Sequence, residues 1–221
     1  MTFSLVGWCR RTGMIGAAVT TSGIGVGSRC PFARAGVGAV LTQHRTDPRI
    51  GPRALDLLAS GLGAADAVAQ LVETDPDIEW RQVAVIDATG ATAFHHGARI
   101  ASVHGAGEGE GCCAIGNILR DPGVPRAMAD AFETAPGSHL ADRLLHALQA
   151  GLAAGGEVRP LASAALLVVH RESFPLVDLR VELDPRPIDQ LAFLWELYRP
   201  QAELYVRRAV DPQSIPYPEV T

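Results

Sequence analysis

The segments of this chain that look like β-strands come in blocks, and pairs of helices separate the blocks. Consecutive helix pairs beside antiparallel hairpins do not suit a doubly wound parallel sheet. The sequence instead predicts an α/β (α+β) fold in which two antiparallel sheets pack face to face with helices outside, a four-layer αββα sandwich. The expected strands are 2–9, 13–21, 37–43, 82–87, 91–95, 112–115, 163–170 and 176–183, and the expected helices are 52–61, 64–72, 124–134, 140–154, 187–198 and 201–210.

The second arm of the first hairpin, Met14 to Thr21, is apolar on both faces until its polar end. Burial on both faces is typical of a sheet that is covered on each side. We expect 31–36 to be a turn and 97–111 to be a glycine-rich loop, with 105–111 a mobile rim of a pocket. No linker or repeat divides the chain, so 1–221 reads as one domain, with 184–221 a C-terminal helical extension and tail.

Composition excludes several classes of function. The 221 residues carry a formal net charge of −5 and are 48% hydrophobic, which gives no reason to expect a nucleic-acid or membrane partner. No run reaches the ~20 apolar residues of a membrane span, and the first residues lack the pattern of a signal peptide. We therefore expect a cytoplasmic protein.

Every basic residue apart from histidine is an arginine, because the sequence contains no lysine. This excludes a phosphate-loop lysine and a Schiff-base lysine, including the linkage to pyridoxal phosphate. No cofactor is implied. The four cysteines, whose spacing fits no zinc site, are interpreted as small reduced core residues: Cys9, Cys30, Cys112 and Cys113.

Thr2 follows the initiator methionine directly. Small second residues allow Met1 to be removed, which would leave threonine at a free N-terminus. Such a residue holds a nucleophilic hydroxyl and, in an α-amine with an ordinary pKa of roughly 7.7 to 8.0, a base. Most chains that begin Met-Thr make no use of this pair, so the remaining sequence must decide.

Several motifs of the chain resemble the DUF1028 family from residue 2 to about residue 200. These motifs are Thr2-Phe3-Ser4, Arg34 to Val40, Thr42-Gln43, Gly51-Pro52-Arg53 with Leu55 to Leu58, Arg81-Gln82, Gly116-Asn117, Leu144 to Gly156, Ser163 to Leu166 and Val177 to Val181. The resemblance implies an N-terminal-nucleophile (Ntn) hydrolase-like fold, the αββα superfamily that includes proteasome subunits. That fold agrees with the order of elements above. Residues 155–163 depart from the commoner pattern of the family.

The function implied by the resemblance is hydrolysis of a carbon–nitrogen bond in a small amide by a terminal nucleophile. Thr2 is the position that matches this role, with its α-amine as the base. The oxyanion would need donors, for which the region of Gln43 and His44 is the first candidate and Asn117 the second. Polar residues expected around the substrate are Thr20, Ser22, His44, Ser163 and Asp178.

Plainer interpretations stay open for several of these residues. Asp178 suits a structural ion pair with Arg180, Ser163 a satisfied core hydroxyl, and His44 a surface loop. The histidines show no metal-binding spacing, so no metal site is expected. Arginines near the expected pocket suggest a substrate carboxylate or form ordinary surface pairs: Arg34, Arg45 and Arg53.

A second class of function is a catalytically silent protein that keeps the sandwich as a ligand-binding module or scaffold. A hydrolase with another nucleophile or a metal is a third. The apolar and aromatic side chains of the last helices, such as Trp195 and Tyr198, suit a homodimer under either of the first two hypotheses.

Overall fold

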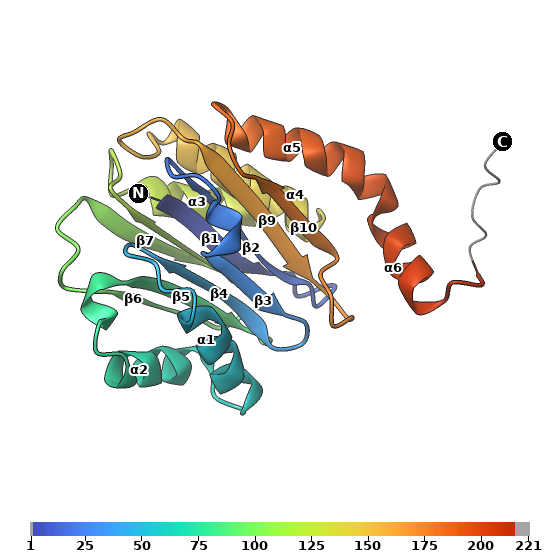
Figure 1. Cartoon of the computed structure of the whole chain (residues 1–221), viewed down its shortest axis with the longest axis horizontal. Helices are drawn as coiled ribbons and strands as arrows, with labels where there is room; N and C mark the ends of the chain where they lie inside the picture. Colours follow the sequence, from blue (N-terminus) through green and yellow to red (C-terminus); the bar gives the residue numbers. More distant parts are fainter. Residues whose placement is uncertain (1, 215–221) are drawn as a thin grey trace.

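The computed structural model describes residues 2–214, which fold into two antiparallel sheets between outer layers of helices (Figure 1). Met1 and residues 215–221 lie outside the described residues, as do the expected removal of Met1 and most of the expected extended tail.

The larger sheet has six strands in the order β10-β9-β2-β1-β8-β7. Strand β1 is therefore an interior strand, paired with β2 on one side and β8 on the other. The strands are β1 (Thr2–Trp8), β2 (Ile15–Thr21), β7 (His104–Gly109), β8 (Cys112–Asn117), β9 (Ser163–Val169) and β10 (Val177–Val181).

The smaller sheet has four strands in the order β3-β4-β5-β6. The strands are β3 (Pro31–Arg34), β4 (Gly38–Gln43), β5 (Gln82–Asp87) and β6 (Thr92–His96). All pairs in both sheets are antiparallel, as the order of elements in the sequence predicted.

Helices cover the outer face of each sheet (Figure 1). The α-helices are α1 (Ile50–Ala59), α2 (Ala64–Thr74), α3 (Val124–Glu133), α4 (Leu140–Ala153), α5 (Pro187–Tyr198) and α6 (Ala202–Val210), and the short 3-10 helices are η1 (Val26–Ser28), η2 (Ile78–Trp80) and η3 (Arg199–Gln201).

Three apolar clusters fill the spaces between the four layers. One joins the small sheet to α1 and α2, and includes Leu71 and Val85. A second lies between the two sheets and includes Val6. The third joins the large sheet to α3, α4 and α5, and includes Phe3 and Leu5. Alternate residues of β1 thus enter two different cores, which explains why the strands are apolar on both faces.

Two expectations about loops were wrong. Residues 31–34 form the edge strand β3, and residues 104–109 form β7. Glycine in β7 has a packing reason, because a Cβ on Gly107 would lie 2.4 Å from the backbone oxygen of Pro125 in α3. The absence of a side chain at Gly107 lets the helix approach the strand, so the glycine-rich run at 104–109 is a strand and not a loop.

The C-terminal helix α5 is part of the helical layer over the large sheet. Trp195 is 3% exposed, and its indole nitrogen donates a hydrogen bond to Asp142 of α4 at 2.7 Å. Helix α6 extends away from the sheets (Figure 1). Among the described residues, no helix is long and apolar enough to cross a membrane.

Candidate functional site

Thr2 begins an interior strand with its hydroxyl on the face that looks toward the small sheet. Its Oγ1 donates a hydrogen bond to Oγ1 of Thr21 at 3.2 Å, and the residue is 6% exposed. The antiparallel pairing of β1 and β8 sets Asn117 opposite Thr2 on the other side. The strand ends therefore gather three polar side chains at one end of the inter-sheet space.

A buried chain of hydrogen bonds joins the two sheets beside Thr2. Ser4 donates to Gln43 at 2.8 Å, and Gln43 donates to Oε1 of Gln82 at 2.7 Å. Asn117 donates to the same oxygen at 3.0 Å, and Gln82 donates to the backbone oxygen of Gly116 at 2.8 Å. Because these side chains are fully buried, the network fixes the sheets relative to each other at this end.

His96 of β6 extends the network. Its Nε2 lies 3.1 Å from Nε2 of Gln82, which donates. Burial, and next the charges of His104 and His95, lower the pKa of His96 to about 4. The imidazole is therefore neutral at physiological pH and can accept the hydrogen bond from Gln82.

Asn117 keeps one unused acceptor in this buried region. Its Nδ2 is bonded to Gln82, whereas its Oδ1 has no hydrogen-bond partner in the described part of the chain. A buried oxygen without a donor costs free energy, so this atom is free to accept a hydrogen bond from a further group.

Glu157 lies on the segment that returns toward the same end of the large sheet. It pairs with Leu119, just beyond β8, and is 4% exposed. Burial raises the pKa of its carboxyl, and the proximity of Ser22, which follows β2, partly opposes the increase. Neither carboxylate oxygen has a hydrogen-bond partner of good geometry among the described residues. A carboxyl that favours its neutral form thus lies near the strand ends that carry Thr2 and Thr21.

The structure separates Thr20 from Thr2. Thr20 lies on the opposite face of β2, where its hydroxyl donates to the backbone oxygen of Ser163 at 2.9 Å. The hydroxyl of Ser163 donates to Gly23 and accepts from the backbone nitrogen of Val26. The side chains of Thr20 and Ser163 therefore form hydrogen bonds with backbone groups. Thr21 is the threonine whose side chain contacts Thr2.

The residues after β4 adopt an unusual backbone conformation. His44 and Arg45 have φ values of 55° and 48°, in the left-handed region that non-glycine residues rarely enter. Nδ1 of His44 lies 2.7 Å from the backbone oxygen of Trp80, and the guanidinium of Arg45 stacks 4.6 Å from the Trp80 ring centroid. The backbone N–H groups of Arg45 and Thr46 make no hydrogen bond within the described residues.

Asp178 does not join this group. It lies on the edge strand β10, and its carboxylate pairs with Arg180 at 2.8 Å, which is the structural ion pair considered above. Two of the three arginines considered for a substrate also have carboxylate partners: Arg34 pairs with Asp56 and Arg53 with Asp75.

Metal ligation finds no support in the described residues, which contain no group of three or more side chains able to hold an ion. All four cysteines are free and buried. Burial raises the pKa of Cys30 to about 11 and that of Cys112 to about 12, so these thiols stay protonated at neutral pH.

The fold and site together define a mixed α/β protein whose two antiparallel sheets share a buried polar network beside the first residue of an interior strand. The chain belongs to the DUF1028 family, a family of unknown function, whose model matches residues 2–191. The crystal structure of the DUF1028 protein SPO2555 from Silicibacter pomeroyi has 32% sequence identity and a TM-score of 0.83, and the match covers 89% of this chain and 85% of that one.

A match of lower quality comes from Anbu (ancestral beta-subunit) from Yersinia bercovieri. It has a TM-score of 0.39 and 9% identity, with 99% of this chain and 100% of that chain covered. A likeness this low carries no argument about fold or function. The search of curated proteins gave no match.

Sequence reasoning missed Thr21, Glu157 and the central role of Gln82. A period-two reading of the hairpin could have found Thr21, because strand pairing sets Phe3 opposite Thr20 and so turns Thr21 toward Thr2. A polar residue directly before the apolar run Val83 to Ile86 was the available signal for Gln82.

Proposed function

We propose that the protein is an Ntn-type amidohydrolase that cleaves a carbon–nitrogen bond of a small molecule with Thr2 as the nucleophile. The observation that carries the proposal is the position of the Thr2 hydroxyl. It lies at the start of an interior strand, 3.2 Å from Thr21 and opposite Asn117, in the polar end of the space between the sheets. The four-layer arrangement of sheets and helices is consistent with the Ntn superfamily.

Removal of Met1 would leave the α-amine of Thr2 as the base. Oγ1 would form a bond to the amide carbonyl carbon while the amine takes its proton and passes it to the leaving nitrogen. The C–N bond then breaks and leaves an ester on Thr2. Water cleaves this ester, which releases the acid and restores the hydroxyl.

The chain has no lysine to adjust the pKa of the amine, so other groups must orient it. Oδ1 of Asn117 is a buried acceptor without a partner among the described residues, and we assign it to the α-amine of Thr2. The donors for the oxyanion are the N–H groups of Arg45 and Thr46. They follow Gln43, whose side chain reaches Ser4 on the same face of β1 as Thr2.

The test is a pair of substitutions at Thr2. Alanine removes the nucleophile and serine keeps a hydroxyl, and both residues are small enough to allow removal of Met1. Turnover of a panel of small amides should disappear in T2A and persist, at a changed rate, in T2S, while circular dichroism shows both folded. Equal turnover in T2A and the native protein would place the chemistry elsewhere.

A second candidate is a ligand-binding protein without catalysis, and one observation favours it. Thr2 lines none of the described cavities, and the cavity of about 620 Å³ lies at the other end of β1, beside Trp8. Under this alternative, T2A would bind ligand like the native protein and neither would turn over any amide of the panel.

A further inference from the structure

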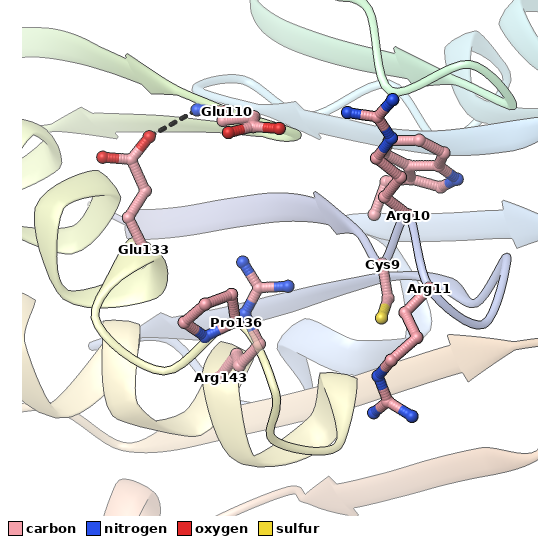
Figure 2. A pocket seen from close by; sticks show the side chains of 8 residues that line it. Cys9, Arg10, Arg11, Glu110, Glu133, Pro136 and Arg143 are labelled. Carbon is pink, nitrogen blue, oxygen red and sulfur yellow. Dashed lines mark hydrogen bonds between the residues drawn. The ribbon is translucent and has the colours of Figure 1, made fainter.

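The cavity of about 620 Å³ has a wall built from charged side chains of distant segments (Figure 2). Arg10 follows β1, Glu110 lies in the turn between β7 and β8, Glu133 ends α3, and Arg143 comes from α4. The volume falls within the about 300 to 1,000 Å³ typical of pockets for small molecules.

Arg143 is the deepest of these charges. The residue is 7% exposed, and its Nε donates a hydrogen bond to the backbone oxygen of Phe132 at 3.0 Å. Its guanidinium carbon lies 3.7 Å from the centroid of the Phe132 ring. These two contacts fix the plane of the guanidinium, whose terminal nitrogens point into the cavity (Figure 2).

Within residues 2–214 this buried cation forms no ion pair with a carboxylate, and the side chain that bonds to it is the Cys9 thiol. None of the ion pairs among the described residues includes Arg143, although Glu110 and Glu133 line the same cavity. Burial lowers the pKa of Arg143, and the attractions of Cys9, Cys112 and Glu110 only partly oppose the decrease. An unpaired buried charge is costly, and an anion that enters the cavity would remove that cost.

We propose that this cavity binds a small monocarboxylate, held by the guanidinium of Arg143. A planar guanidinium presents two parallel donors that match the two oxygens of a carboxylate. Glu110 and Glu133 place two negative charges on the opposite wall, which disfavours polyanions such as phosphate (Figure 2). The binding site is separate from Thr2, since the two lie at opposite ends of β1.

Two residues of the cavity provide readouts. Trp8 lines it, whereas Trp80 and Trp195 lie in η2 and α5, so fluorescence that changes on binding and is lost in Trp8→Phe reports binding at this end of β1. Its loss in Arg143→Gln assigns the signal to this cavity, because Arg143 lines it and does not line the neighbouring hollow beside Trp8. Cys9 is the second. Burial raises its pKa, but hydrogen bonds with Thr12 and the charge of Arg143 bring the pKa below its ordinary value. A carboxylate on Arg143 would weaken that effect and slow alkylation of Cys9.

The experiment titrates the full chain with acetate, propionate, inorganic phosphate and ethylammonium chloride by calorimetry and Trp8 fluorescence. We expect saturable binding of the carboxylates and none of ethylammonium. Arg143→Gln should weaken carboxylate binding by about tenfold or more. Arg143→Lys should give an intermediate loss, and Arg34→Gln, which removes an exposed arginine elsewhere, should leave binding unchanged.

If Arg143→Gln does not fold, two variants at the cavity rim test whether the cavity binds a monocarboxylate. Arg10→Gln should weaken carboxylate binding, and Glu110→Gln should strengthen phosphate binding. The proposal fails if the native protein binds no carboxylate, if it prefers phosphate, or if the folded Arg143→Gln variant binds as well as the native protein. Because T2A leaves this cavity intact, T2A should bind carboxylates normally, which separates this test from that of the nucleophile.

Discussion

The hydroxyl of Thr2 donates its hydrogen bond to the hydroxyl of Thr21, 3.2 Å away, across the first hairpin of the chain. This contact ties a side chain at the start of β1 to the last residue of β2. It gives the proposed nucleophile a partner that fixes its rotamer, and it makes Thr21 the first residue to test after Thr2.

Replacing Thr21 by valine keeps the shape of the side chain and removes its hydroxyl. We expect a loss of about 1 kcal/mol in the free energy of unfolding. If Thr2 is the nucleophile, turnover should also fall, because its hydroxyl loses the partner that orients it. Thr20→Val is the matched control: it removes a hydrogen bond to Ser163 on the opposite face, so stability should fall while turnover holds. Equal turnover in both variants would refute an orienting role for Thr21.

Gln82→Met should be the most destabilising single change in the polar network. The variant leaves the amide of Gln43 and the amide of Asn117 without their acceptor, and the backbone oxygen of Gly116 without its donor. Each unsatisfied buried group costs about 1 to 3 kcal/mol. Urea unfolding should show a loss of more than about 2 kcal/mol, whereas Gln70→Met on the exposed face of α2 should change little. A comparable midpoint for both variants would contradict the network.

Glu157 should destabilise the folded chain at neutral pH. Its pKa in the folded protein lies above the ordinary value of 4.5, so the folded state holds the proton more tightly than the unfolded state does. Unfolding free energy therefore falls as pH rises above that value, by about 1.4 kcal/mol for each unit of difference. Glu157→Gln should be more stable than the native protein at pH 7 and equal to it below about pH 4. Glu73→Gln, at an exposed position, should show no pH-dependent difference from the native protein. If the native protein has a higher free energy of unfolding than Glu157→Gln at pH 7, the carboxylate is stabilising and the prediction is wrong.

His96 should act in the opposite direction. Its pKa is lowered from 6.5 to about 4, so the unfolded state takes up a proton first as pH falls. The contribution of neutral His96 to the free energy of unfolding should be fully present above pH 6.5. It should decline toward pH 4, by on the order of 1 to 2 kcal/mol because the side chain is partly exposed. His96→Gln should remove this decline and His146→Gln, on the exposed side of α4, should keep it. NMR titration checks the cause directly: an imidazole of His96 that becomes charged near pH 6.5 would contradict it.

Much of the fold followed from local pattern. Strands such as β2 and β9 are apolar on both faces, and only a sheet covered on each side buries both faces, so their place between layers was predictable. Strands β3 and β7 were not predictable from the sequence, because proline and glycine are local signals for turns. Their reason is tertiary: β3 pairs with β4 at an edge, and β7 needs glycine where α3 approaches.

The candidate site was predictable only in part. The chemistry of a terminal threonine identified Thr2, but pairing across strands decides which neighbours face it. Thr20 and Thr21 are the same residue type, and only the strand register shows that their side chains lie on opposite faces of β2. The burial of Glu157 and Arg143 was not predictable, because charged residues usually lie at the surface and only the packing around these two shows that they are buried.

The most direct test of the account combines intact mass with a β-lactone that acylates hydroxyl nucleophiles. We predict that the purified protein lacks Met1 and gains one lactone mass, that peptide mapping places the ester on Thr2, and that T2A gains none. A chain that keeps Met1 and is still acylated, or an ester mapped to another residue and retained in T2A, would contradict Thr2 as the nucleophile.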